Sequence, residues 1–359
     1  MRGPIITALP LASTPATTTL HTIADLQLWI ITVAGILVLL ALDFIITRRP
    51  HAVEMKEAIG WSAFYIALPL TFGLWVWNAH GSEIGLQYYT GYLVEKSLSV
   101  DNLFIFILIL SAFAVPRALQ QRVLLIGIIG ALVLRTIFIA VGAVLISRFS
   151  IIFLVFGAIL LITAWGVFKD ALSDDHEVDV QELKAVKWAK KIWPVTDEYE
   201  GTKLTVQQKG RRALTPLGLV ALAILGTDIV FAIDSVPAVY GITGDPYLVF
   251  ITNAFALLGL RALYFVLQGA LGKLRYLGYG LALILAFIAV KLVLHWAHTV
   301  WPEVPGIPTT TSLIVIVVIL VMTAVLSLWA ERRDQRRLAP PVTTHGTPED
   351  DDDFRTGPR

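Results

Sequence analysis

Two short segments of the chain carry acidic residues inside runs that are otherwise largely apolar. The first segment reads Glu95-Lys96-Ser97-Leu98-Ser99-Val100-Asp101-Asn102. The second segment reads Thr227-Asp228-Ile229-Val230-Phe231-Ala232-Ile233-Asp234-Ser235. Each places a second carboxylate six residues after the first, followed by a small polar residue. Carboxylate, amide and hydroxyl oxygens suit Mg²⁺, Ca²⁺ and Mn²⁺, whereas zinc and copper sites call for cysteine or histidine. The two segments therefore predict a binding site for a divalent cation.

The candidate site consists of metal ligands and of residues that support them. The expected ligands are Glu95, Asp101, Asn102, Asp228 and Asp234. The expected supporting residues are Ser97, Ser99, Thr227, Ser235, Asp43, Lys96, Arg135 and Arg261. No resident cofactor is expected, because the cation would be the cargo.

The cost of placing charge in a membrane limits what these acids can do. A charged side chain at the bilayer centre costs at least ~2.5–3.5 kcal/mol, so four carboxylates facing lipid singly would cost on the order of 10 kcal/mol. They must face a cavity, pair with a basic residue or bind a cation. In the pairing alternative, Arg135 and Arg261 neutralise two acids and Lys96 neutralises a third. That alternative leaves the neighbouring hydroxyl and amide oxygens unexplained.

Helix geometry restricts how the two acids of one segment can share an ion. Six residues of a regular helix rise about 9 Å and turn the side chain about 120° away from the first. One solution is a helix broken at Pro237, which removes a backbone hydrogen bond. The other is a shared ion with Asp101 facing Asp234, so that the remaining pair lines the path. Asp43 is expected to pair with Arg48 or Arg49, or to act at a cytoplasmic mouth.

The elements that position these residues are membrane spans. The chain is 56% hydrophobic and 15% charged, with a mean hydropathy of +0.74, and a span needs roughly 20 apolar residues. The sequence predicts an all-α polytopic protein of nine spans, at 26–47, 58–79, 88–114, 121–146, 149–169, 215–240, 247–270, 274–297 and 309–331. The expected domains are a leader (1–25), two N-terminal spans (26–80), a first three-helix unit (85–169), a loop (170–213), a second three-helix unit (214–297), a last span (308–331) and a disordered tail (332–359).

Basic residues in the connecting segments predict the orientation. One side of the predicted membrane carries two Lys or Arg residues and the other carries twenty-two. Cytoplasmic loops are the ones enriched in Lys and Arg. We therefore expect the N-terminus outside and the C-terminus, together with the loop 170–213, in the cytoplasm. Within that loop, residues 178–193 suit an amphipathic surface helix, although a simple connector is also compatible with the sequence.

The two acidic segments belong to a longer internal repeat. Arg135 and Arg261 each lie in the span after an acidic segment, and the third span of each unit contains a lysine, Lys169 or Lys291. Three spans is an odd number, so the second copy must be inverted in the membrane. Inverted repeats are typical of secondary transporters, whose sites lie near the midplane between the repeats.

Several function classes lack support in the sequence. There is no cysteine, which excludes disulfides, thiolate metal sites and cysteine nucleophiles. The net charge of +1 suggests no nucleic-acid partner. Neither a nucleophile–base set nor an ATP-binding motif is visible, so we do not expect an enzyme. The expected partners are the lipid bilayer and a metal ion, and no protein partner is indicated.

The two acidic segments resemble those of the TerC/Alx family of bacterial membrane proteins, and the second resembles it through Val236-Pro237-Ala238. The similarity extends over roughly residues 25 to 331. It implies nine helices in the bacterial cytoplasmic membrane, a tellurium-resistance label, and Mn²⁺ export for Alx-like members. It also implies that the five expected ligands occupy the family's acidic positions. Lys96 departs from the pattern, because other members often have asparagine there, and it could alter the charge balance.

Two hypotheses about function follow. The first is a secondary transporter that exports a divalent cation, most simply Mn²⁺, in exchange for protons, because carboxylates bind either ion. The alternative is a non-transporting scaffold or partner in tellurite resistance, metal loading of secreted proteins or membrane-protein insertion. In the alternative, the loop 170–213 and the tail carry the function.

Overall fold

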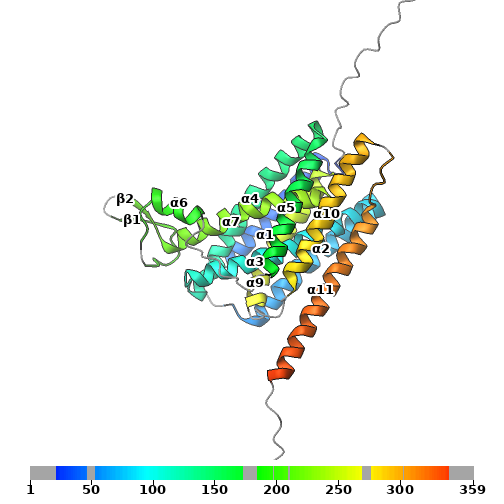
Figure 1. Cartoon of the computed structure of the whole chain (residues 1–359). Coiled ribbons are helices and arrows are strands. Elements are labelled where there is room, and N and C mark those ends of the chain that lie inside the picture. Colours follow the sequence, from blue (N-terminus) through cyan, green and yellow to red (C-terminus); the bar gives the residue numbers. More distant parts are fainter. Residues whose placement is uncertain are drawn as a thin grey trace, which may run out of the picture.

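The computed structural model describes residues 22–46, 53–172, 184–196, 198–208, 211–268, 276–301 and 303–338. The described elements are α1 (Leu26–Ile46), α2 (Met55–His80), α3 (Ser82–Ala112), α4 (Arg117–Arg148), α5 (Ile151–Leu172), α6 (Lys184–Ile192), β1 (Thr205–Gln208), β2 (Arg211–Leu214), α7 (Pro216–Tyr240), α8 (Pro246–Leu258), α9 (Leu260–Gln268), α10 (Leu277–Val300) and α11 (Thr309–Leu338). Long helices form one bundle, and the short elements α6, β1 and β2 lie together at one side of it (Figure 1). The predicted all-α polytopic fold is confirmed.

Most of the long helices meet the requirements of a membrane span. In the described ranges, α1, α2, α4, α5, α7, α10 and α11 are long and apolar enough, and the pair α8 and α9 would count as one more span, bent by 42°. The remaining expected span is α3, which has 31 residues but carries Glu95, Lys96 and Asp101 in its middle. The multi-pass membrane architecture therefore stands, while the count of nine stays a prediction.

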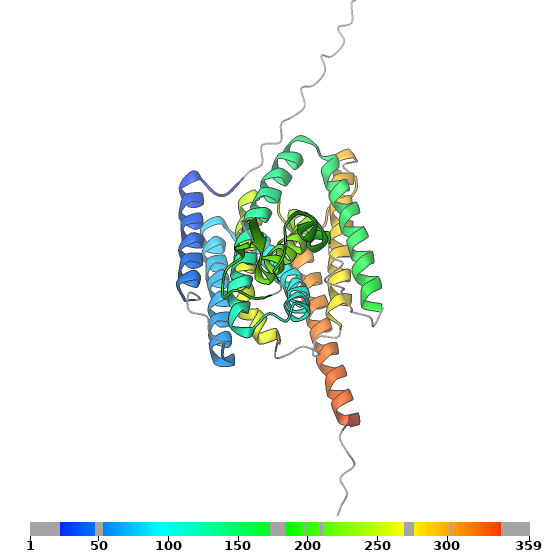
Figure 2. The same ribbon diagram turned by 90° about the vertical axis from the view of Figure 1, so that its left-hand side faces the viewer.

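The position of α3 explains how it tolerates these charges. It packs against α2, α7, α8, α9, α10 and α11, and its cyan ribbon lies inside the bundle, with α1 and α5 at opposite edges (Figure 2). The outer helices instead present apolar side chains outward, as Ile162 and Trp165 of α5 and Met322 of α11 do. Because α3 is surrounded by protein, its polar residues face other helices and not lipid.

Hydrogen bonds near the helix ends show which connecting segments share one end of the bundle. The backbone N–H of Ile23 donates to Asp245 Oδ2 at 2.7 Å, and Thr243 donates to Gln87 at 2.7 Å. The hydroxyl of Tyr240 donates to the carbonyl of Ile139 at 2.8 Å. The start of α1, the start of α3 and the α7–α8 connection thus share one end of the bundle, as the predicted topology requires. Which end faces the cytoplasm stays a prediction.

The two predicted three-helix units pack in a way that agrees with a repeat. The helices α3 and α7 contact each other, as do α4 and α8, and α5 lies along α10. The cross pairs also correspond, because α3 contacts α8 and α4 contacts α7. A two-fold relation between the units would produce these pairs, and the inverted repeat itself stays a prediction.

The structure corrects two local expectations. The helix α7 is continuous from Pro216 to Tyr240 and is not broken at Pro237; the break among the described helices lies between α8 and α9. The helix α11 continues to Leu338, so the first part of the expected tail is helical. Residues 1–21 of the leader, residues 173–183 of the loop and residues 339–359 of the tail lie outside the described residues.

The described part of the loop 170–213 is folded and is more than a simple connector. The predicted helix is present as α6, and its residues Val186 and Ala189 are buried against the body of the protein. The strands β1 and β2 pair antiparallel, with Thr205 opposite Leu214. The Thr215 side chain donates to Lys203 and accepts from the N–H of Gly218, which caps α7. The loop is therefore tied directly to the helix that carries Asp228 and Asp234.

Candidate functional site

A buried cluster of charges joins the two three-helix units. Arg135 of α4 donates from Nη1 to Glu95 Oε2 of α3 at 3.0 Å. It also donates to Asp228 Oδ1 of α7, from Nη2 at 3.2 Å and from Nε at 3.3 Å. Arg135 and Glu95 are 0% exposed, and Asp228 is 1% exposed. Glu95 and Asp228, the first acids of the two segments, thus bind the same guanidinium. For these two residues the structure shows neutralisation by a basic side chain.

Three more side chains complete this Arg135 cluster. Asn253 of α8 donates from Nδ2 to Glu95 Oε1 at 2.7 Å. The amide oxygen of Asn102, in the orientation that satisfies its hydrogen bonds, accepts from Arg135 Nη2 at 3.0 Å. Asp234, half-buried on α7, lies near enough to interact electrostatically with both Arg135 and Glu95. Helices α3, α4, α7 and α8 therefore all contribute to the cluster.

The cluster contains buried oxygen atoms that this network does not use. In the described part of the chain, Asp228 Oδ2 and Asn253 Oδ1 have no hydrogen-bond donor, and the hydroxyls of Ser99 and Ser235 have no partner. Ser99 lies one turn after Glu95 on α3, and Ser235 lies two turns after Asp228 on α7. Carboxylate and amide oxygens are thus unused in the cluster, and two unpaired hydroxyls lie on the helix faces that carry its acids.

The structure does not present a finished metal cage. Among the described residues, no group of three or more His, Cys, Asp or Glu side chains is placed to hold a metal ion. A divalent cation bound here would need amide and hydroxyl oxygens in addition to carboxylates. The assignment of the expected residues as metal ligands therefore stays a prediction.

Other expected residues lie at the edge of the cluster or outside it. Ser97 donates to the carbonyl of Leu93 at 2.7 Å, and Thr227 donates to the carbonyl of Ile224 at 2.8 Å, so both hydroxyls bond their own helices. Asp101 is half-buried, and its predicted approach to Asp234 stays a prediction. The Lys96 ammonium lies at the α8–α9 break, 2.9 Å from where a Cβ on Gly259 would stand.

A second buried ion pair links the N-terminal helices to α9. Arg261 donates from Nη2 to Asp43 of α1 and from Nη1 to Gln121 of α4. The hydroxyl of Tyr65 on α2 donates to the same Asp43 oxygen at 3.2 Å. The structure gives Asp43 a partner that is distant in sequence, Arg261, and the expected pairing of Asp43 with Arg48 or Arg49 stays a prediction. Arg48 and Arg49 lie outside the described residues.

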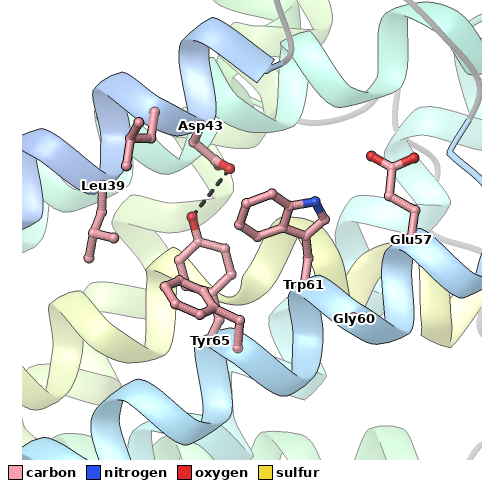
Figure 3. A pocket seen from close by; sticks show the side chains of 8 residues that line it. Leu39, Asp43, Glu57, Gly60, Trp61 and Tyr65 are labelled. Atoms are coloured by element: carbon pink, nitrogen blue, oxygen red, sulfur yellow. Dashed lines mark hydrogen bonds between the residues drawn. The ribbon is translucent and has the colours of Figure 1, made fainter.

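A cavity of about 560 Å³ opens between α1 and α2 beside this second pair. Figure 3 shows the Asp43 carboxylate and the Tyr65 hydroxyl pointing toward each other at its wall. The cavity is lined by Leu39, Leu42, Asp43, Glu57, Gly60, Trp61, Phe64 and Tyr65. None of these residues belongs to the Arg135 cluster, so the cavity belongs to the second pair.

Sequence reasoning missed several polar partners of these clusters. Asn253 was detectable as a lone amide in an otherwise apolar span. Tyr65 and Gln121 carried no comparable signal, because neither is charged and neither lies in an acidic segment. The repeat also misled: it relates Arg135 to Arg261, yet the two arginines bind different acids in different clusters.

Comparisons with known proteins agree with this architecture. The model of the integral membrane protein TerC family matches residues 80–335. An uncharacterized membrane protein of Myxococcus xanthus is 42% identical over 278 residues, which cover 77% of this chain and 86% of that protein. An uncharacterized membrane protein of Mycobacterium tuberculosis strain H37Rv is 42% identical over 75% of this chain and 68% of that protein.

A further relative carries a functional description. Alx of Escherichia coli K12, described as a candidate membrane-bound redox modulator, is 40% identical over 77% of this chain and 88% of that protein. No solved structure matches the chain. The family match covers most of the chain and includes both acidic segments, and the predicted resemblance is confirmed. The chain belongs to the integral membrane protein TerC family.

Proposed function

We propose that the chain is a secondary transporter that moves a divalent metal cation, Mn²⁺ first, out of the cytoplasm through the Arg135 cluster. The observation that carries the proposal is an excess of acids over bases: Glu95 and Asp228 both pair with the single guanidinium of Arg135, and the half-buried Asp234 interacts with it electrostatically. A structural ion pair needs one acid for each base. Burying further carboxylates costs free energy unless a cation neutralises them.

The unused oxygens support the choice of a hard divalent cation. Asp228 Oδ2 and Asn253 Oδ1 are buried and accept no hydrogen bond from the described residues. Oxygen ligands of this kind suit Mn²⁺, Mg²⁺ and Ca²⁺. The cluster includes Asn253 of α8, which belongs to the helix pair broken between α8 and α9. Secondary transporters typically bind their ions between their repeats, beside broken helices of this kind, which supports the proposal.

Export needs an energy source, because moving a divalent cation out against an inside-negative potential costs about 4.6 kcal/mol per 100 mV. Proton exchange is the drive that we propose, since the same carboxylates bind protons. The protein then resides in the bacterial cytoplasmic membrane with its N-terminus outside and its C-terminus inside. In this role it is not an enzyme and needs no resident cofactor.

One observation favours the scaffold as a second candidate. Ile192 and Trp193, at the end of α6, are 48% and 39% exposed, although they belong to an ordered loop. Apolar side chains on such a loop could dock a protein partner. The redox description of Alx belongs to that relative, and any redox role here would have to proceed without cysteine thiols.

The total manganese content of cells separates the two candidates. Bacteria that express the chain are loaded with Mn²⁺, and cellular manganese is then measured over time at matched protein abundance. Transport predicts faster loss of manganese with wild type than with Glu95→Gln. Glu83→Gln serves as the matched control, because Glu83 is an exposed acid on the same helix. Equal loss with wild type and Glu95→Gln would favour the scaffold.

A further inference from the structure

The cavity between α1 and α2 has no part in the proposed transport path. Its volume of about 560 Å³ lies within the range of ligand pockets. The helix α1 packs against α4 and α8, and the cavity lies between α1 and α2. Two of the lining side chains, Leu42 and Phe64, are 50% and 43% exposed. Because both helices are membrane spans, a cavity that is open at these side chains opens toward lipid.

The walls of the cavity suit hydrocarbon better than water. Leu39 and Leu42 of α1 line it together with Trp61 and Phe64 of α2. Apolar walls give a water molecule few hydrogen-bond partners, and an empty gap forfeits the dispersion contacts of the atoms around it. A flexible acyl chain makes these contacts and needs no polar partner. The walls therefore select an apolar chain.

The polar groups of the cavity follow the order found along a phospholipid. Glu57, Trp61 and Tyr65 are spaced four residues apart on α2 and therefore share one face. Glu57 lies in the first turn of the helix, and Trp61 lies between it and the Asp43–Tyr65 pair (Figure 3). Tryptophan is typical of the boundary between headgroups and acyl chains. The described lining contains two acids, Asp43 and Glu57, and no basic side chain, so its charge complements a cationic headgroup.

Gly60 keeps the cavity open. It lies on α2 beside Trp61 and lines the cavity. A Cβ at this position would meet no other atom within 4 Å, so no close approach of a neighbouring helix calls for glycine. Glycine is also unfavourable inside a helix. Its effect at this position is to leave volume free for a ligand.

We infer that the cavity binds an acyl chain of phosphatidylethanolamine, with the primary ammonium of the headgroup at Glu57 and the chain along Trp61 and Phe64. The bound chain would complete the packing between α1 and α2 beside the Asp43–Arg261 pair. None of the lining residues belongs to the Arg135 cluster. The inference therefore does not depend on which ion the protein transports.

Native mass spectrometry of the purified, full-length protein in detergent counts the lipids that it retains. The protein is titrated with phosphatidylethanolamine or with phosphatidylglycerol that carries the same acyl chains. Wild type should retain phosphatidylethanolamine preferentially. Gly60→Leu fills the cavity and should weaken this binding by on the order of 10-fold. Gly166→Leu on α5 is the matched control, because a Cβ there also meets no atom within 4 Å, and it should bind the lipid like wild type.

Two further variants test the headgroup and the chain separately. Glu57→Gln should lower the affinity for phosphatidylethanolamine by up to about 5-fold, the effect of an exposed ion pair, and leave the affinity for phosphatidylglycerol unchanged. Leu42→Trp fills the cavity from the side of α1 and replaces Gly60→Leu if that variant does not accumulate.

Three results would overturn the inference. The first is equal retention of phosphatidylethanolamine by wild type and by the variant with the filled cavity. The second is equal affinity of wild type for the two lipids, because the acids would then not select the headgroup. The third is a wild-type dimer that Gly60→Leu separates, because a second copy of the protein would then occupy this face.

Discussion

The two acids of α7 should respond very differently to the same substitution. Asp228→Asn removes the acceptor of two hydrogen bonds from Arg135, and both partners are buried. Breaking a buried ion pair in this way costs ~3–5 kcal/mol. Glu95 still holds Arg135 after the change, so we expect a loss near 3 kcal/mol, the lower end of that range.

Asp234→Asn should leave the fold intact. Asp234 is only half-buried, and it interacts with Arg135 and with the like charge of Glu95 through space. Its removal costs some attraction to the arginine and relieves repulsion from Glu95. We therefore expect unfolding stability that is unchanged or slightly raised, and a gap of about 3 kcal/mol between the two variants.

Thermal unfolding in detergent, with and without Mn²⁺, measures both effects. A ligand at one hundred times its dissociation constant stabilises a protein by about 2.7 kcal/mol. Wild type should show such a Mn²⁺-dependent rise, and both variants should lose it. The reasoning is refuted if Asp234→Asn unfolds as easily as Asp228→Asn and wild type shows no response to Mn²⁺, because the acids would then serve only the structure.

Three further predictions concern other parts of the chain. Asp43→Asn leaves Arg261 buried without its acid, so the free energy of unfolding should fall by ~3–5 kcal/mol. Adding Arg261→Gln should restore part of that loss. If the single variant kept full stability, the ion pair would be dispensable. Reporter fusions should read cytoplasmic after Arg337 and external at Gly244, and the same side for both would contradict the topology. Truncation after Leu338 should preserve Mn²⁺ efflux from cells, since α11 ends there, and lost efflux at normal abundance would favour the scaffold.

Sequence periodicity and hydropathy were sufficient for the architecture. Long apolar runs must form helices in a membrane because their backbone groups have no water to bind, so most helix positions followed within a few residues. The loop was harder to predict. The strands β1 and β2 are short and polar, and they are held by contacts such as that of Thr215 with Lys203, which no local pattern reports.

The candidate site was predictable in its composition but not in its pairing. The repeat identified Glu95, Asp228 and Arg135, and the cost of buried charge indicated that they must meet. Which acid pairs with which base depends on helix rotation and packing. Arg261 binds Asp43 because α1 and α2 approach α9, a tertiary contact that sequence spacing does not encode.

The most direct test of the account is Mn²⁺ flux in liposomes that contain only the purified protein. An internal dye that Mn²⁺ quenches reports entry under an imposed Mn²⁺ gradient, with wild type, Glu95→Gln and Glu83→Gln reconstituted in equal amounts. The account predicts rapid quenching with wild type and Glu83→Gln, and quenching at the rate of protein-free liposomes with Glu95→Gln. Wild-type flux no faster than that of protein-free liposomes, or Glu95→Gln flux equal to wild type, would contradict transport through the Arg135 cluster.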